Sequence, residues 1–522
     1  MNKQDEQPHR SLAASIGTNT LFGFLSNFTQ MGTRLVTVPI VIHHLGLGGY
    51  GIWNIIMMSA TYMRFGSVGV KTAFQKYVAE ATGNGDYEKA NRLLSTGCAL
   101  MLLVSIAILI PLSYFSQHIA QAGGVPPEFL KSSAGAISLL ALIMMMANVG
   151  AAYEAIVMGG HRIDLARKFS TILTILEAIA IVAVLHFGFG LFAMASVMGA
   201  SELLYIGCCY IASHNVVPQI RISIESLDRG VLFELFRFAG SYQLLNLLEV
   251  LYGSIIPFTI LKAFGAESSG VYAVVTRIAT SAVVLQDAFL TPILSGGTMV
   301  FASGSAERMQ ALVIKAFKVT LGLALLPFGF ISIFGPKMAY AWTGQNSPAF
   351  RVAFVLVCLA FFWRAFSMLS FVLYRTSGKA LLDNILQVVR TLVLLVIVAF
   401  AHKLGFRGVL SGMAFTEFIG MFFMLFALTH TFHLFRIKSL LPDSARMVIA
   451  AIVILGTGVI ASYVPMRIDL GGRLLATVKL VEICLGCLLI AWPALAWTGS
   501  ITAVESRALF SAFLPKQTDP AP

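Results

Sequence analysis

The chain has 522 residues, of which 57% are hydrophobic and only 11% are charged, and its mean hydropathy is +0.83. These values exclude a water-soluble globular protein and predict an all-helical integral membrane protein that crosses the bilayer many times. The formal net charge of +12 does not indicate nucleic-acid binding, because the basic residues stand in small groups at the ends of hydrophobic segments.

Apolar runs long enough to cross a bilayer core of about 30 Å predict about fourteen transmembrane helices. In chain order they lie at about residues 14–42, 50–72, 93–115, 134–158, 169–187, 190–213, 238–261, 270–300, 312–335, 350–374, 386–402, 408–432, 447–466 and 474–498. The first run is too long for the core of a signal peptide, so we expect it to be retained.

Lysine and arginine are concentrated in every second connection between these runs. Examples are Lys71, Lys76, Lys89 and Arg92, then Arg162, Arg167 and Lys168, then Arg308, Lys315 and Lys318. This alternation is the positive-inside pattern, and it predicts that both termini lie in the cytoplasm.

A stretch near the start of the chain is duplicated. Residues Pro39 to Trp53 and Pro257 to Tyr272 are near copies, in which Gly46 and Gly51 correspond to Gly265 and Gly270. Six helices separate the copies, and this even number predicts two lobes related by a pseudo-twofold axis along the membrane normal. Because glycine adopts backbone angles that other residues resist, we expect the four glycines to act as outer hinges or gates.

The duplication predicts four regions of the chain. An N-terminal lobe of helices one to six spans 1–215, a cytoplasmic linker spans 216–237, and a C-terminal lobe of helices seven to twelve spans 238–435. Residues 436–522 hold a trailing helix pair and a cytoplasmic tail. Apolar residues alternate with charged residues along the linker, which predicts a helix lying on the membrane surface.

Several arginines remain inside the apolar runs, where an ionised side chain costs about 2.5–3.5 kcal/mol on insertion scales. They either line a cavity that attracts an anion or pair with carboxylates on neighbouring helices. Polar residues at helical spacing on the first helix of each lobe favour the cavity over interhelical hydrogen bonds alone. The cavity candidates are Arg34, Arg64, Arg277, Arg364, Asn19, Gln30 and Asn246. Arg390 and Lys479 lie near enough to helix ends for their charges to reach the interface.

Two carboxylates of the second lobe, Glu249 and Asp287, are candidates for coupling transport to Na⁺ or H⁺, because a buried carboxylate can cycle a proton. They could instead neutralise Arg277 or Arg364, and we favour this salt-bridge interpretation. Glu202 and Glu417 occupy equivalent positions in the two lobes, which indicates a structural role.

We expect no cofactor, no metal site and no enzymatic activity. All six cysteines fall inside hydrophobic segments, and the sequence holds neither a phosphate-binding loop of the GxxxxGK[ST] type nor an HExxH motif. No stretch outside the membrane exceeds about 25 residues, which is too short to bury a core of its own.

The duplicated motifs carry a resemblance to a known family. They are Leu45-Gly46 with Tyr50 to Trp53, the glycine-rich element at Gly66 to Gly69, residues Ala79 to Asp86, and the second copy from Phe264 to Tyr272. With them the chain resembles the MATE-like flippase superfamily, in particular its polysaccharide-exporting branch.

The resemblance implies a pair of six-helix lobes around a cationic central cavity that opens alternately to each side of the bacterial inner membrane. The implied cargo is an undecaprenyl-diphosphate-linked oligosaccharide, moved from the inner to the outer leaflet for lipopolysaccharide or exopolysaccharide biosynthesis. Implied partners are this lipid-linked oligosaccharide, membrane lipids, and polysaccharide polymerase and chain-length machinery.

Two other functions compete with this interpretation. A multidrug cation antiporter of the same superfamily should present acidic residues to its cargo, whereas the first helix carries Arg34 and no carboxylate. An integral-membrane glycosyltransferase or polymerase usually needs sizeable outer loops, and the longest ones here, at about 116–133 and 336–349, are short and poor in carboxylates.

Overall fold

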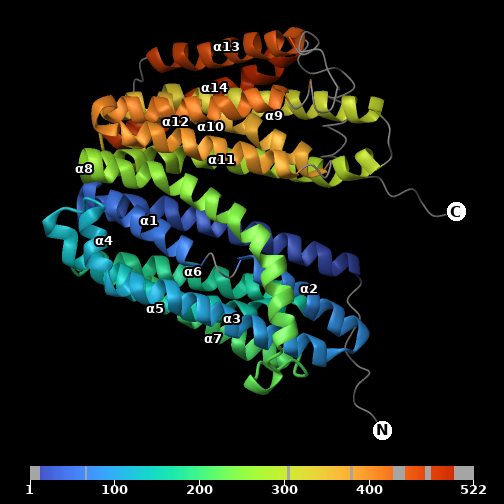
Figure 1. Cartoon of the computed structure of the whole chain (residues 1–522). Coiled ribbons are helices and arrows are strands. Elements are labelled where there is room, and N and C mark those ends of the chain that lie inside the picture. The colour runs from blue at the N-terminus through green and yellow to red at the C-terminus, as the bar shows by residue number, and fades with distance from the viewer. Residues whose placement is uncertain are drawn as a thin grey trace. The chain divides into compact units, whose positions relative to one another are not determined.

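A computed structural model of the chain describes residues 12–64, 68–302, 306–376, 380–426, 429, 441–464 and 472–498. Every regular element in these ranges is a helix (Figure 1). Ten of the described helices are long and apolar enough to cross a membrane. The predicted all-helical, multi-pass membrane protein is therefore confirmed.

About fourteen segments are predicted, and two very long helices each account for two of them, while α11 (Ala380–Ala399) and α12 (Ala401–Phe426) match two more that are not among these ten. α1 (Leu12–Met63) contains Gly46 with φ 71° and ψ 174°, and α8 (Arg229–Ala302) contains Gly265 with φ 83° and ψ 177°. This combination of angles is open almost only to glycine. Each long helix is thus two membrane-crossing segments joined by a single kinked residue, at matching positions of the repeat.

The chain divides into two compact units, Met1–Gly270 and Val271–Pro522, which we call the N-terminal and C-terminal units. The boundary falls within α8, shortly after the kink at Gly265. The lobe boundaries at about residues 215 and 238 stay a prediction.

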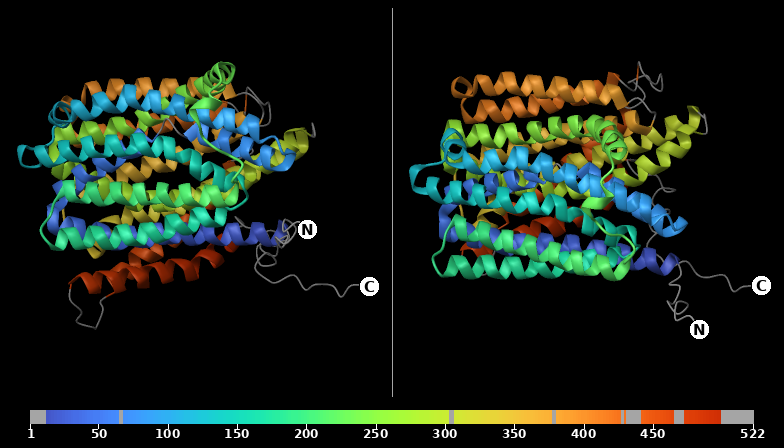
Figure 2. Two further views of the ribbon diagram at one scale, coloured as in Figure 1. Left: turned by 90° about the horizontal axis from the view of Figure 1, so that it is seen from below. Right: turned by 60° about the horizontal axis from the view of Figure 1, so that its bottom comes forward.

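The N-terminal unit is organised around α5 (Pro127–Gly159), which packs against α1, α3 and α7 (Figure 2). Small residues on α5, among them Ala152 and Ala155, lie at its contacts and allow close approach of neighbouring helices. The other elements are α2 (Val68–Asn84), α3 (Tyr87–Tyr114), α4 (Ser116–Ala122), α6 (Ile163–His186) and α7 (Leu191–Val216). α4 lies in the predicted outer loop at 116–133.

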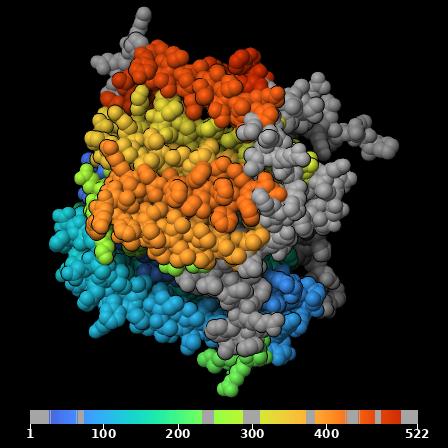
Figure 3. Space-filling view, turned by 45° about the horizontal axis from the view of Figure 1, so that its top comes forward, coloured from blue at the N-terminus to red at the C-terminus, as the bar shows by residue number. Residues whose placement is uncertain are grey.

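The C-terminal unit is organised around α10 (Ala349–Thr376), which packs against α9 (Ala306–Thr343) and α12 (Ala401–Phe426). In the space-filling view, the orange side chains of α11 (Ala380–Ala399) and α12 form one continuous face of this unit (Figure 3). α13 (Leu441–Tyr463) and α14 (Gly472–Trp497) pack on each other and on α9. The predicted outer loop at 336–349 is shorter than expected, because α9 continues to Thr343.

Candidate functional site

The two copies of the repeated turn pack against each other within the N-terminal unit. A Cβ atom added to Gly51 would collide with the backbone of Ser269 and Gly270, and one added to Gly270 would collide with the backbone of Leu47. Backbone atoms cannot move aside without shifting a helix. Gly51 and Gly270 are therefore required for the close crossing of the segments that follow the two kinks.

Gly46 and Gly265 have a different role. A Cβ atom at either position would meet nothing within 4 Å, but both residues have a positive φ that other residues rarely adopt. The four predicted hinge glycines thus form two pairs, one that sets backbone direction and one that permits contact. Their action as gates stays a prediction.

Charged side chains of five helices gather inside the N-terminal unit. Arg64 at the end of α1 binds Glu202 of α7, with 2.9 Å between Nη1 and Oε2. Lys71 of α2 binds Glu154 of α5, with 2.6 Å between Nζ and Oε1. Arg64 was expected either to line a cavity that attracts an anion or to pair with a carboxylate. In the structure it pairs with a carboxylate of a neighbouring helix.

A third carboxylate joins these pairs. Glu177 of α6 lies within electrostatic range of Arg34 and Glu202, beside the Ser201 hydroxyl. We call the set Arg34, Arg64, Lys71, Glu154, Glu177 and Glu202 the N-terminal charge cluster. It holds three cations and three carboxylates, so its formal charges balance, and the arginines predicted to line a cationic cavity are partly neutralised in this unit.

The sequence analysis missed three members of this cluster. Lys71 was interpreted only as a topological signal, and Glu154 and Glu177 were not singled out, although both lie within predicted apolar runs. A carboxylate inside such a run requires a partner for the same reason as an arginine. Counting acids as well as bases would have identified them.

The C-terminal unit pairs its charges differently. Arg390 of α11 binds Glu417 of α12, with 2.5 Å between Nη2 and Oε2. Arg277 of α8 and Arg364 of α10 are half-buried, and within the described ranges neither makes an ion pair. The role predicted for these two arginines stays a prediction.

The remaining predicted residues carry less information. Gln30 is half-buried on α1, and its backbone carbonyl accepts a hydrogen bond from the Thr33 hydroxyl at 3.1 Å. Glu249 is exposed on α8. The side chains of Asn19, Asn246 and Asp287 lie outside the described part of the structure. The proposed coupling role of Glu249 and Asp287 stays a prediction.

The search for metal ligands gives no candidate in the part of the chain that the structure describes. No group of three or more histidine, cysteine, aspartate or glutamate side chains in this part could hold a metal ion.

The linker after α7 is bound to α3 along its length. Side chains on one face of α3 pair with its backbone: Asn91 Oδ1 accepts from Arg221 N at 2.9 Å, Ser95 Oγ from Ser223 N at 3.0 Å, and Thr96 Oγ1 from Asp228 N at 3.0 Å. These contacts hold the linker extended, with a single 3-10 turn at Ile224–Ser226. The linker is therefore extended as far as Asp228, and a helix begins at Arg229, so that Glu234 and Arg237, on which the predicted surface helix rests, are helical. Its place on the membrane surface stays a prediction.

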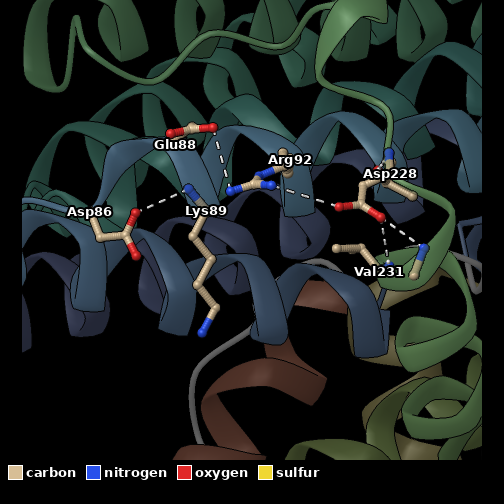
Figure 4. Close-up of polar contacts among 8 residues, drawn as sticks. Asp86, Glu88, Lys89, Arg92, Asp228 and Val231 are labelled. Atoms are coloured by element: carbon tan, nitrogen blue, oxygen red, sulfur yellow. Dashed lines mark hydrogen bonds and ion pairs between the residues drawn. The ribbon is translucent and has the colours of Figure 1, made fainter.

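Asp228 connects this linker to the next helix. Its carboxylate accepts hydrogen bonds from the backbone of Gly230 at 2.7 Å and Val231 at 3.4 Å, which caps the start of α8. Figure 4 shows Arg92 of α3 between this carboxylate, at 3.9 Å, and Glu88, at 3.4 Å. The start of α8 is thereby fixed to the N-terminal unit.

Comparisons with known proteins agree with this architecture. Residues 16–296, more than half of the chain, match the family described as "Polysaccharide biosynthesis protein". The chain is 23% identical over 350 residues to the uncharacterized membrane protein EpsK of Bacillus subtilis (strain 168), which covers 63% of this chain and 68% of that protein.

Two solved structures show a similar fold. The lipid II flippase MurJ in an inward closed conformation aligns with a TM-score of 0.68 and 14% identity, covering 91% of this chain and 99% of its own. An inward-facing multidrug resistance MATE family transporter of the MOP superfamily aligns with a TM-score of 0.66 and 17% identity, covering 80% and 97%. At these identities the likeness concerns the fold.

Proposed function

The chain belongs to the polysaccharide biosynthesis protein family and has the fold of the MOP-superfamily transporters, and on this premise we propose that it is a flippase for a lipid-linked oligosaccharide. The cargo is an undecaprenyl-diphosphate-linked oligosaccharide, and transport runs from the inner to the outer leaflet of the bacterial cytoplasmic membrane by alternating access. The product supplies a polymerase and chain-length machinery that assemble a cell-surface polysaccharide.

The observation that carries this proposal is the pair of half-buried arginines in the C-terminal unit. Arg364 lies near the middle of the apolar helix α10, and neither it nor Arg277 makes an ion pair among the described residues. An ionised group inside the membrane without a protein partner is expected to serve a ligand. A guanidinium binds a phosphate through two parallel hydrogen bonds, which suits the diphosphate of the cargo.

The proposed orientation of the chain in the membrane rests on the basic residues of the N-terminal unit. Those at the end of the unit away from Gly46 include Lys76, Lys89, Arg92 and Arg162, and by the positive-inside rule this end faces the cytoplasm. The crossing of Gly51 and Gly270 then lies on the outer side. Its opening would release cargo to the outer leaflet.

Return of the empty carrier needs a coupling step, for which we propose Glu249 and Asp287 with Na⁺ or H⁺. Either group can bind a cation or a proton as access to water alternates.

A specific observation also favours a second function. Glu154, Glu177 and Glu202 place three carboxylates inside the N-terminal unit, as a multidrug cation antiporter would require. Each has a cation within electrostatic range, however, which weakens the attraction of the cluster for a cationic drug. We therefore place this function second.

The proposal is tested with purified protein in liposomes. We expect Arg364→Ala to lose most of the translocation of a lipid-diphosphate oligosaccharide, and Arg364→Lys to be impaired although it keeps the charge. Arg351→Ala is the matched control, because Arg351 is exposed near the start of the same helix. Wild-type translocation by Arg364→Ala would contradict the headgroup role.

A further inference from the structure

A groove lies at the basic end of the N-terminal unit. It has a volume of about 450 Å³ and is lined by the turn between α5 and α6, the start of α6 and the end of α7. Arg162, Leu165, Phe169, Cys208, Ile211 and Asn215 are among its lining residues.

Two exposed apolar stripes lead into this groove. On α6, Leu165 and Phe169 begin a stripe that continues at helical spacing through Ile172 and Leu176, which are 56% and 52% exposed. On α7, the lining residue Ile211 is 64% exposed and is preceded on the same face by Leu204, at 59%. Because α6 and α7 pack on each other and Leu165, Phe169 and Ile211 line the same groove, both stripes begin at the groove.

The part of the groove at the turn between α5 and α6 is polar and positively charged. Arg162 is half exposed, and its Nε donates to Asp164 at 3.1 Å, while Lys168 approaches the other oxygen of that carboxylate at 3.7 Å. Arg167 adds a third cation on the same helix, so the start of α6 keeps a positive charge after Asp164 is counted. The terminal nitrogens of Arg162 make no hydrogen bond within the described ranges.

The backbone places Arg162 at this position. His161, in the turn before it, has φ 61°, and it is the one residue other than glycine with a positive φ in the described part of the chain. This turn reverses the chain between α5 and α6 and brings Arg162 to the edge of the groove. A residue held in this unfavourable conformation often marks a functional position.

We propose that the groove binds an anionic phospholipid of the leaflet at this end of the membrane. One acyl chain lies in the groove and along the apolar stripes of α6 and α7, and the phosphate lies at Arg162, whose terminal nitrogens can bind two of its oxygens. The cytoplasmic leaflet is rich in anionic lipids and attracts such basic groups. The site includes none of the cargo arginines and is independent of which cargo is carried.

The proposal is tested by native mass spectrometry. The protein is first exchanged into a mixture of phosphatidylglycerol and phosphatidylcholine of equal chain length, and is then released from detergent in the spectrometer. We expect the wild-type protein to retain more phosphatidylglycerol than phosphatidylcholine. In Arg162→Gln the ratio of the two retained lipids should fall about threefold or more. Cys208→Phe should lose retention of both lipids, because Cys208 lines the groove and the added ring fills it. Lys76→Gln is the control, since Lys76 is 68% exposed on another helix at the same end of the unit.

Three results would overturn the proposal. They are an unchanged preference in Arg162→Gln, an equal loss in Lys76→Gln, and competition by the deacylated headgroup that is as strong as competition by the whole lipid. The last result would mean that the site binds a phosphate without an acyl chain. Because Arg162→Gln leaves Asp164 paired with Lys168, its result stands even where Cys208→Phe fails to fold.

Discussion

Glu202 and Glu417 occupy matching positions of the internal repeat, yet their arginine partners come from different helices. Glu202 binds Arg64 of α1, and Glu417 binds Arg390 of α11. The first pair has side chains 37% and 14% exposed, whereas the second has side chains 10% and 2% exposed. Both lobes therefore keep the glutamate and an arginine that neutralises it. The helix that supplies the arginine differs between the lobes, and so does the exposure of the paired side chains.

This difference indicates a division of labour between the two pairs. Removing one partner of a buried ion pair leaves the other charge without compensation in a medium of low dielectric constant. A pair with more exposure is screened and exchanges more easily with water or ligand. We infer that the C-terminal pair holds α11 to α12, whereas the N-terminal pair can open.

The largest expected effect is the loss of stability in Glu417→Gln. This change leaves Arg390 buried and uncompensated, which costs about 3–5 kcal/mol, whereas Glu202→Gln should cost about 1 kcal/mol or less. The apparent melting temperature in detergent measures both. The double variant Arg390→Met with Glu417→Met should recover much of the loss, and equal melting temperatures for the two glutamine variants would contradict the comparison.

The two glycine pairs give the next effect. Gly51→Val or Gly270→Val should slow transport without preventing membrane insertion, because the added side chain collides with the backbone of the opposite turn. Gly265→Ala meets no neighbour and should cost only about 1–3 kcal/mol of backbone strain. Translocation rates and membrane levels separate these outcomes. Normal export by both valine variants would remove the gating role and leave only helix packing.

The smallest effect is expected at the linker. Asp228→Ala removes the cap of α8 and should cost about 1 kcal/mol. Arg92→Gln, which breaks only exposed ion pairs, should cost about 0–1 kcal/mol. Hydrogen exchange of the backbone at 219–231 measures the linker directly. A larger loss of protection in Arg92→Gln than in Asp228→Ala would show that the ion pair, and not the cap, holds this segment.

The framework of the fold could be predicted from the sequence because it is local. Apolar length gives the membrane segments, and two glycines of the repeat, Gly46 and Gly265, stand at the kinks of α1 and α8 in the structure. The linker could not be predicted in this way. Its conformation depends on Asn91, Ser95 and Thr96, which lie about 130 residues earlier in the chain.

The candidate site was predictable only in part for the same reason. An arginine inside an apolar run can be recognised from sequence, but its partner cannot. Arg64 and Glu202 are separated by 138 residues, and nothing in the local pattern of either indicates that they meet. The sequence places Arg390 near a helix end, where its charge could reach the interface, whereas the structure shows it buried against Glu417.

The most direct measurement is a comparison of two cargoes in the same liposomes containing the purified wild-type protein. One is a lipid-diphosphate oligosaccharide, whose headgroup is followed by accessibility to an impermeant modifying enzyme, and the other is a fluorescent lipophilic cation. A flippase of the proposed kind exposes the oligosaccharide faster than empty liposomes do and leaves the cation undisturbed. Transport of the cation without movement of the oligosaccharide would contradict the proposal and identify the protein as a cation exporter.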